Sequence, residues 1–152
     1  MSETKWEIRE ATMEDASSLT TCMVMAYSTY NERLDGAFLP PMHVDYKEEI
    51  ASFPVFVIED KEEIIGASIV MYEDDYLQIA NIAVRPDYQG EGLGRVLMEF
   101  AESIARDKGY SEMRLATHAL LTENRSYYLH LGWEESGRDE TRIYMKKAIT
   151  EK

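Results

Sequence analysis

The sequence predicts an α+β fold, because strand patterns and helix patterns both recur along one chain. Short stretches alternate between apolar and polar residues or are continuously apolar, and tight polar turns join several of them. Other stretches repeat apolar residues every three or four positions, which is typical of helices. The chain has 152 residues, 45% of them hydrophobic, so it is long enough to bury a core. We therefore expect a single domain over residues 1–152.

The first half of the chain should contain a strand, two helices and a strand hairpin. Residues 6–11 alternate as a strand does, and Thr12 followed by Asp15 resembles the capping box that starts a helix. That helix should end near Tyr30. The other elements expected here are an irregular segment over residues 31–43, a short helix over 45–51, and strands over 54–59 and 64–72 around a turn at 60–62.

The centre of the chain, residues 77–105, carries the strongest signal. Residues 77–84 are apolar enough for a central strand, and Pro86 ends it because proline cannot donate to a sheet. Three glycines then alternate over residues 89–94, and an amphipathic helix with Arg95 in its first turn follows. A helix that begins in a glycine turn directs unpaired N–H groups and the positive end of its dipole at one point. This arrangement is typical of a phosphate-binding site.

Beyond this helix the chain should contain three more strands and one more helix. Gly109 is a fitting C-terminal stop for the central helix. The elements expected after it are strands over residues 113–117, 133–135 and 142–147, and a helix over 123–131 that ends at Gly132. A turn over residues 136–141 should join the last two strands.

The glycine turn does not match the common nucleotide-binding loops. A P-loop requires a lysine followed by serine or threonine, and no such pair follows Gly94. The dinucleotide fingerprint is G-x-G-x-x-G, whereas this chain has G-x-G-x-G. The turn instead resembles the pyrophosphate loop of the GNAT superfamily of N-acetyltransferases, whose V-x-P and [QR]-x-x-G-x-[GA] pattern is filled by Val84, Pro86, Gln89, Gly92 and Gly94. A turn that serves only helix–strand packing is the alternative.

The resemblance covers nearly the whole chain and implies both a fold and a cosubstrate. The expected order β-α-α-β-β-β-α-β-α-β-β is that of a GNAT domain, a mixed, mostly antiparallel sheet with helices on both faces. The family's cosubstrate is acetyl-CoA, which pairs with backbone groups at the end of the central strand and places its phosphates on the helix N-terminus. The residues that the resemblance assigns to acetyl-CoA binding are Ile82, Ala83, Val84, Gln89, Gly90, Glu91, Gly92, Leu93, Gly94, Arg95 and Asn124.

A second segment, residues 122–133, resembles the T-E-N-x-x-x-Y-x-x-L-G-[FY] pattern of many GNAT members. In the family the asparagine, here Asn124, lies along the cofactor, and the tyrosine faces the departing sulfur. The resemblance therefore implies that Tyr128 is the catalytic acid, since a phenol can protonate a leaving thiolate. The tyrosine–glycine spacing selects Tyr128 over the adjacent Tyr127. Aromatic packing at the end of a short helix is the alternative role for Tyr128.

The sequence assigns no general base. Many relatives carry a glutamate or aspartate where this chain has Ala80, which takes no proton. The remaining candidates, none of which has a distinguishing spacing, are Glu73, Asp74, Asp75, His43 and His118. For the two histidines, a structural hydrogen bond is the commoner outcome. A base that acts through ordered water, or an amine that arrives neutral, stays open.

Together these features predict an N-acetyltransferase that moves an acetyl group from acetyl-CoA to a primary amine by direct attack in a ternary complex. No Cys-His or Ser-His pair suggests a covalent intermediate, and we expect the single cysteine, Cys22, in the core. We assign no metal ligands. Two alternatives stay open: a non-catalytic acyl-CoA-binding sensor or partner module, which the missing acid at position 80 permits, and a transferase that uses a longer acyl-CoA.

The charge balance narrows the class of partner. The 29 acidic and 16 basic residues give a net charge of −13, which disfavours nucleic acid. It fits a small-molecule or peptide amine, although many soluble acidic proteins share it. No apolar run reaches membrane length, so we expect no membrane association, and the single cysteine fits a reducing, cytoplasmic location. A homodimer is left open.

The family fold also implies which segments face the acceptor. They are the first helix, the loop after it and the turn over residues 136–141. The residues of the first two segments that could form an acceptor pocket are Tyr27, Tyr30, Leu34, Phe38 and His43. Core packing is the alternative for the two tyrosines, because they share one helix face.

Overall fold

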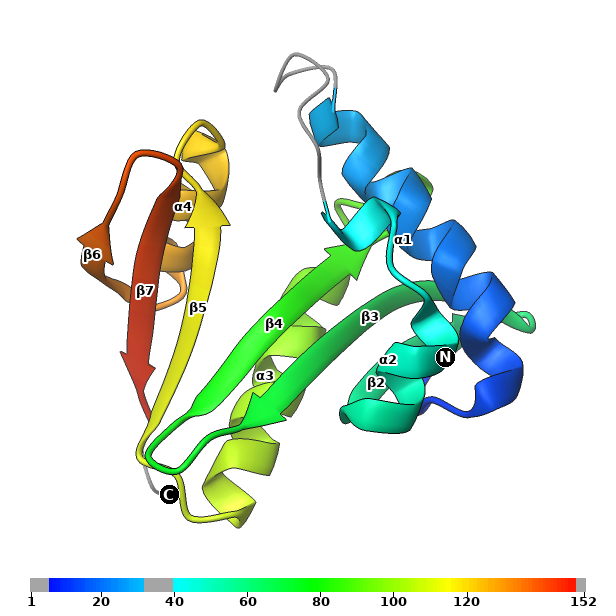
Figure 1. Ribbon diagram of the computed structural model, residues 1–152, viewed down its shortest axis with the longest axis horizontal. Helices are drawn as coiled ribbons and strands as arrows, with labels where there is room; N and C mark the ends of the chain where they lie inside the picture. Colours follow the sequence, from blue (N-terminus) through cyan, green and yellow to red (C-terminus); the bar gives the residue numbers. More distant parts are fainter. Residues whose placement is uncertain (1–5, 32–39, 150–152) are drawn as a thin grey trace, which may run out of the picture. The chain divides into compact units, whose positions relative to one another are not determined.

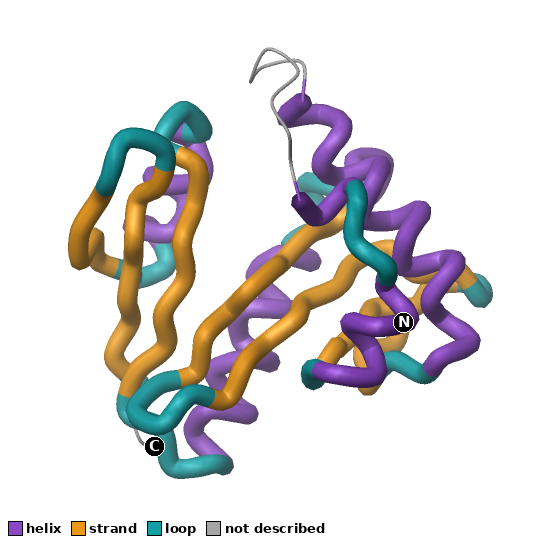
Figure 2. Tube along the Cα trace, in the orientation of Figure 1, coloured by secondary structure: helices purple, strands orange, loops and turns teal. Residues whose placement is uncertain are grey.

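The computed structural model describes residues 6–31 and 40–149, which contain seven strands and four α-helices (Figures 1 and 2). The strands are β1 (Trp6–Glu10), β2 (Val55–Asp60), β3 (Glu63–Tyr72), β4 (Leu77–Val84), β5 (Glu112–His118), β6 (Glu134–Arg138) and β7 (Arg142–Ala148). The α-helices are α1 (Ala16–Asn31), α2 (Tyr46–Ser52), α3 (Leu93–Asp107) and α4 (Thr122–His130). Three single turns of 3₁₀-helix are η1 (Met13–Asp15), η2 (Pro40–Met42) and η3 (Pro86–Tyr88). The observed order confirms the predicted one.

The described strands form one mixed sheet in the order β1-β2-β3-β4-β5-β7-β6. The pairs β1–β2, β2–β3, β5–β7 and β6–β7 are antiparallel. By contrast, β4 and β5 run parallel, with Leu77 opposite Met113 and Gln78 opposite Arg114. A parallel pair requires a crossover connection, and α3 provides it. The mostly antiparallel α+β fold that the sequence predicts is therefore confirmed.

The residues group into two compact units. The first comprises Met1–Val70 and Asn81–Met98, and the second comprises Met71–Ala80 and Glu99–Lys152. The end of β4, the glycine turn and the start of α3 belong to the first unit. The start of β4, the rest of α3 and all elements from β5 onward belong to the second.

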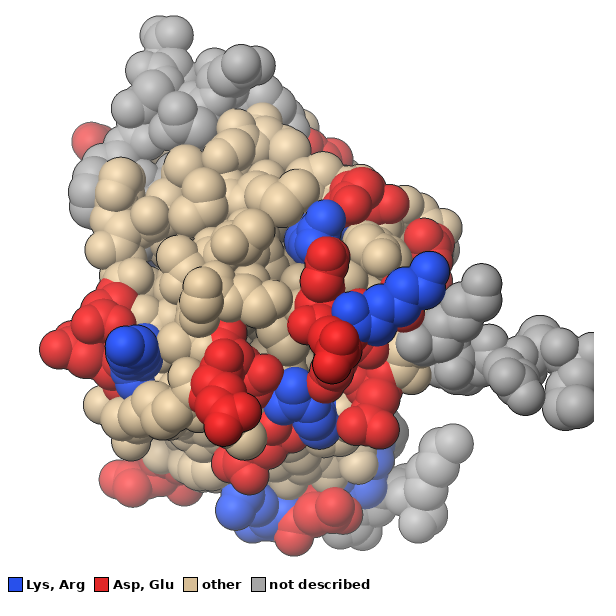
Figure 3. All heavy atoms as spheres, turned by 90° about the vertical axis from the view of Figure 1, so that its right-hand side faces the viewer, with Lys and Arg blue, Asp and Glu red and all other residues tan. Residues whose placement is uncertain are grey.

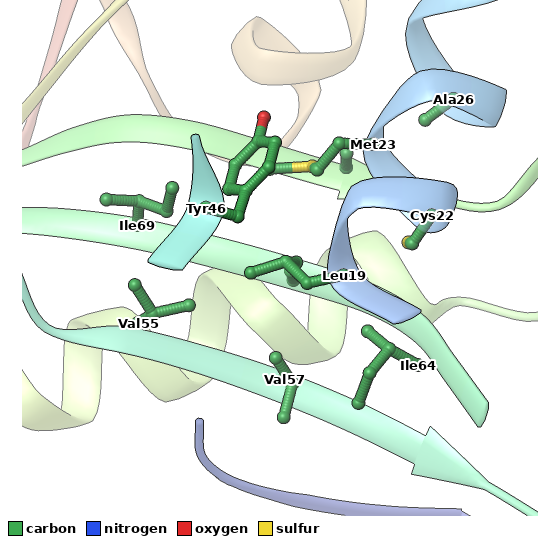
Figure 4. Close-up of a cluster of buried hydrophobic side chains, with 11 residues drawn as sticks. Leu19, Cys22, Met23, Ala26, Tyr46, Val55, Val57, Ile64 and Ile69 are labelled. Atoms are coloured by element: carbon green, nitrogen blue, oxygen red, sulfur yellow. The ribbon is translucent and has the colours of Figure 1, made fainter. Parts of the chain in front are cut away.

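In the first unit, α1 and α2 pack on one face of the sheet (Figure 4). Alternate strand residues point to this face, as the period of a strand requires. The buried side chains that meet there are Leu19, Cys22, Met23 and Ala26 of α1, Tyr46 of α2, Val55 and Val57 of β2, Ile64, Ala67 and Ile69 of β3, and Ala83 of β4. These contacts hold the end of β4 against α1.

The opposite face of the same unit packs against the start of α3. Leu93 and Leu97 are buried there against Ile58 and Ile65, which alternate with the residues facing α1. Gly66 permits this close approach, because a Cβ on it would lie 3.3 Å from the carbonyl oxygen of Ala83 and 3.5 Å from a Leu97 methyl group. Helices thus cover both faces of this part of the sheet, as predicted.

In the second unit, β5 and β7 supply alternating buried side chains, among them Leu115 and Met145. The helix α4 packs against β6, where Arg125 donates to Glu135 at 2.8 Å. Two left-handed glycines end helices at the predicted positions: Gly109 (φ +86°) after α3 and Gly132 (φ +98°) after α4.

One predicted boundary is wrong. Strand β6 extends to Arg138, so Ser136, Gly137 and Arg138 lie in the strand and the turn is shortened to residues 139–141. The pairing register shifts between Glu135 and Gly137, which is a β-bulge. A bulge interrupts the alternation of side chains, and for this reason the alternating pattern in the sequence ends at residue 135.

Candidate active site

The glycine turn and the start of α3 are the segment in which the sequence predicts a phosphate site. The residues from Gln89 to Gly92 are exposed, and Leu93, the first residue of α3, is buried. The Val96 N–H donates to the Gly92 carbonyl oxygen at 3.1 Å, which closes the first turn of the helix. The N–H groups of the three preceding residues therefore have no acceptor within the helix. They add to the positive end of the helix dipole at this point.

Two glycines of this turn adopt left-handed backbone conformations, with φ +89° at Gly90 and +79° at Gly92. A Cβ on either residue would have no other heavy atom within 4 Å. The need for glycine therefore comes from the backbone angle and not from packing against a neighbour. This observation argues against the alternative in which the turn serves only helix–strand packing.

The side chain of Gln89 holds the turn to the strand before it. Its Nε2 donates to the carbonyl oxygen of Val84 at 3.3 Å. In the same region, Ala83 is buried against α1, while Ile82 and Val84 pack on the α3 side. These three side chains pack within the protein, and the family resemblance expects the backbone groups of residues 82–84 to contact a ligand.

The segment that leads into the turn makes contacts that the sequence analysis missed. The Tyr88 hydroxyl donates to Asp60 Oδ2 at 3.0 Å, and this bond raises the pKa of the Tyr88 phenol. Arg85 pairs with Glu63 at 3.1 Å and with Asp87 at 2.9 Å. Tyr88 lies within the family motif, whereas Asp60 is 28 residues away in the sequence. The sequence Asp60-Lys61-Glu62 predicts a turn and gives no sign of a contact with Tyr88. This pair could therefore not be predicted from the sequence.

The second unit contains Asn124 and Tyr128 on α4. The Asn124 side chain donates to Thr117 Oγ1 at 3.4 Å, and Thr117 is a buried residue of β5. No sequence signal indicated Thr117, because a threonine in a strand is usual. Its hydroxyl orients the asparagine amide.

The two adjacent tyrosines of α4 differ in burial. Tyr128 is 9% exposed and Tyr127 is 40% exposed. The Tyr128 ring packs on Trp133, with centroids 6.1 Å apart and an interplanar angle of 60°. Aromatic packing at the end of the helix is therefore present. This packing involves the Tyr128 ring and does not determine whether the hydroxyl takes part in the reaction.

The candidate bases do not gain support from their surroundings. His118 Nδ1 accepts a hydrogen bond from the Leu120 N–H at 3.1 Å, which is the structural role considered for this histidine. Ala80 is exposed on β4, and the carboxylates of Glu73, Asp74 and Asp75 precede the start of that strand.

On the α1 side of the first unit, Tyr27 lies near β4. Its hydroxyl is 3.5 Å from Asn81 Oδ1, and its ring meets Tyr30 edge-on with centroids 5.9 Å apart. Burial raises the pKa of the Tyr27 phenol, so it stays protonated. Tyr27 also packs on the buried core, which supports the structural role considered for it. Leu34 and Phe38 lie outside the described residues.

Cys22 is fully buried in the core between α1 and the sheet. Burial raises the pKa of its thiol to about 12. A buried, protonated thiol is not a nucleophile, because the thiolate is the reactive form. The expectation that Cys22 is a core residue is confirmed.

Acidic side chains cover more of the face shown in Figure 3 than basic ones do, in line with the net charge of −13. Within residues 6–31 and 40–149, no group of three or more His, Cys, Asp or Glu residues is arranged to hold a metal ion. None of the described helices is both long and apolar enough to span a membrane.

Comparison with known proteins decides the family. A model described as an acetyltransferase (GNAT) domain matches residues 51–135, which is more than half of the chain. The chain belongs to the GNAT acetyltransferase family. An uncharacterized N-acetyltransferase of Chlorobaculum tepidum is 27% identical to this GNAT protein over 129 residues, which cover 84% of this chain and 75% of the relative.

Solved structures share the fold of this GNAT protein. The PaiA N-acetyltransferase of Thermoplasma acidophilum, in complex with coenzyme A, superposes with a TM-score of 0.81 over 95% of this chain and 99% of that one, at 19% identity. The ribosomal-protein-S18-alanine N-acetyltransferase of Escherichia coli superposes with a TM-score of 0.77 over 97% and 96% of the two chains, at 22% identity.

The family membership establishes the general activity. This GNAT protein is an acetyl-CoA-dependent acetyltransferase, and acetyl-CoA is its cosubstrate. Such enzymes act on amine substrates, either proteins or small molecules. The described residues fit acetyl-CoA, since the left-handed turn at Gly90 and Gly92 leaves open space at the start of α3 where phosphate groups would lie.

Proposed function

We propose that this GNAT protein transfers the acetyl group to a primary amine of a small molecule or peptide by direct attack in a ternary complex. The amine nitrogen attacks the thioester carbonyl carbon, the carbon–sulfur bond breaks, and an amine proton leaves to water. The burial of Cys22 supports direct attack, because the only cysteine of the chain cannot reach a thioester to form an acetyl-enzyme.

The proposed cofactor site of the first unit consists of the backbone of residues 82–84 and the turn and first helical residues 89–95, and the family resemblance also assigns Asn124 of the second unit to the cofactor. The observation that carries this assignment is the exposed left-handed turn at Gly90 and Gly92, where a Cβ on either residue would have no other heavy atom within 4 Å. Phosphates bind such helix starts through backbone N–H groups and the helix dipole. We assign Tyr128 as the group that donates to the leaving thiolate.

An isosteric pair of variants tests the cofactor site. Gly92→Asp introduces a negative charge where we place the pyrophosphate, and Gly92→Asn introduces the same shape without charge. Both residues tolerate the left-handed backbone better than other side chains do. We expect coenzyme A binding by calorimetry to be lost in Gly92→Asp and to be weakened much less in Gly92→Asn.

Gly109→Asp is the matched control, because Gly109 is also left-handed with open space around it but lies at the other end of α3. It should lose thermal stability and keep coenzyme A affinity. Wild-type affinity in a folded Gly92→Asp protein would overturn the assignment.

Steady-state kinetics tests the mechanism and the acceptor class. We expect acetyl-CoA and amine to give intersecting double-reciprocal lines, since a ternary complex forms before the chemical step. Thiol release should be measured with polyamines, amino acids, aminoglycosides and peptide N-termini. A binding protein without activity would show thermal stabilisation by acetyl-CoA and no thiol release with any of them, and a preference for a longer acyl-CoA would appear as faster release from that donor.

A further inference from the structure

The turn between β2 and β3 adopts a conformation that its residues disfavour. Lys61 and Glu62 both have positive φ, +52° and +68°. Two-residue hairpin turns of this kind prefer asparagine and glycine, because side chains with a Cβ crowd the backbone in the left-handed region. Such a conformation persists when the surrounding structure holds it.

The two residues that flank this turn both contact the segment before the glycine turn. Asp60 accepts a hydrogen bond from the Tyr88 hydroxyl at 3.0 Å, and Glu63 pairs with Arg85 at 3.1 Å. The Arg85 N–H also donates to the Ile65 carbonyl oxygen at 2.8 Å, and its guanidinium lies 5.7 Å from the centre of the Tyr88 ring. The segment is therefore held by both side chain and backbone.

Stability alone does not account for Asp60. The residue is 8% exposed, and its Oδ1 is buried with no hydrogen-bond partner among the described residues. Burying a carboxylate that is only partly hydrogen-bonded is unfavourable, because it loses its hydration. What the carboxylate gains is one charge-assisted bond to Tyr88, the residue immediately before Gln89 of the glycine turn.

We propose that Asp60 and Tyr88, supported by the Glu63–Arg85 ion pair, are positioning residues for acetyl-CoA binding. The Asp60–Tyr88 bond fixes the backbone of η3, and η3 leads directly into the turn over residues 89–94. The backbone N–H groups at the start of α3 then face the phosphates without having to be ordered on binding. Pre-ordering of this kind increases affinity by reducing the entropy lost when the ligand binds. The inference rests on the cofactor site proposed above.

Tyr88→Phe removes the hydroxyl and keeps the ring. We expect the KM for acetyl-CoA and the dissociation constant of coenzyme A to rise about tenfold, the size expected for one hydrogen bond to a charged group. The kcat at saturating acetyl-CoA should stay within about twofold of wild type, since neither residue contacts the reacting atoms. Asp60→Ala should have the same effect, and Asp60→Asn, which keeps an acceptor oxygen, should recover most of the affinity.

Tyr110→Phe is the matched control. Its hydroxyl also makes one hydrogen bond, to the Glu73 carbonyl oxygen at 2.7 Å, but both residues belong to the second unit and the glycine turn to the first. This variant should lose thermal stability and keep wild-type affinity for coenzyme A. The double variant Asp60→Ala with Tyr88→Phe should be no weaker than either single variant, because the two residues form one bond.

The outcomes separate this inference from the proposed cofactor site. One outcome would contradict the positioning role alone. In that outcome Gly92→Asp loses coenzyme A binding, whereas the folded variants Tyr88→Phe, Asp60→Asn and Asp60→Ala keep wild-type affinity. The proposed cofactor site would then be retained. If Tyr88→Phe and Tyr110→Phe lower affinity equally, the effect is one of general stability and the positioning role is again wrong. If Gly92→Asp binds as wild type does, the cofactor site itself is wrong.

Discussion

The backbone N–H of Trp133 donates to the carbonyl oxygen of Tyr128 at 3.0 Å, and the rings of the same two residues pack 6.1 Å apart. Gly132 is left-handed, with φ +98°, and its N–H donates to the Leu129 carbonyl oxygen at 3.1 Å. These features together form a Schellman motif at the end of α4. The spacing between Tyr128 and Gly132 thus matches the family pattern and is also the spacing that this helix-ending motif requires. It places the tyrosine ring against the residue after the glycine, which fixes the orientation of the ring.

Tyr128→Phe should separate the two roles of this residue. The ring and its packing stay, so we expect the folded protein and its affinity for acetyl-CoA to be kept. The kcat should fall by roughly 10²–10⁴-fold if the hydroxyl protonates the leaving thiolate in the transition state. Stopped-flow measurement of thiol release under saturating acetyl-CoA gives the chemical rate.

Tyr127→Phe is the control for the adjacent tyrosine, which is exposed and points about 100° away around the helix. It should leave turnover nearly unchanged. If Tyr127→Phe is the slow enzyme, Tyr127 and not Tyr128 donates to the thiolate. If both variants turn over normally, the thiolate leaves unaided or is protonated by water, and the assignment of Tyr128 is wrong.

The ion pairs of Glu135 predict a pH dependence of stability. Hydrogen bonds from Arg138 and Arg125 lower the pKa of this carboxyl from 4.5 to about 2. A group whose pKa is lower in the folded state stabilises the protein above its unfolded pKa. That contribution should be lost as the pH falls from about 4.5 towards 2.

Thermal melts as a function of pH test this contribution. Glu135→Gln should melt at a lower temperature than wild type at pH 7, and the gap should narrow below pH 4. Glu134→Gln is the control, because Glu134 is exposed and lies 3.8 Å from Lys146, a distance at which solvent screens the pair. A gap that stays constant with pH would show that Glu135 contributes by packing and not by charge.

Replacing the disfavoured turn residues should stabilise the protein. Lys61→Asn with Glu62→Gly supplies residues that adopt positive φ readily, so we expect the free energy of unfolding in urea to rise by about 1 kcal/mol. The affinity for coenzyme A should not change, because Asp60 and Glu63 keep their contacts. Lower stability would mean that the side chains of Lys61 or Glu62 make compensating contacts in the native state.

Cys22 should be inert in the folded protein. Its full burial and its raised pKa of about 12 remove the thiolate that alkylating reagents require. Iodoacetamide at pH 8 should label the native protein only at the rate of its unfolding, and should label it rapidly in urea. Fast labelling of the native protein would reopen the possibility of a covalent acetyl-enzyme.

Elements whose signals are local can be predicted from the amino-acid sequence. The strand before Pro86, the glycine turn and the helix stops at Gly109 and Gly132 depend on residues within one or two turns of each other, so spacing alone predicts them. The bulge in β6 was missed, because it depends on how β6 pairs with β7 and not on its own residues.

Contacts between residues that are distant in the chain become visible only in the folded protein. Asp60 and Tyr88 are 28 residues apart, and only the packing of β2 and β3 beside the end of β4 gives the buried carboxylate its donor. The ion pair between Arg85 and Glu63, which are 22 residues apart, likewise forms only in the folded chain. Hydrogen-bond partners depend on distances of a few tenths of an ångström, and those distances exist only after the chain has folded.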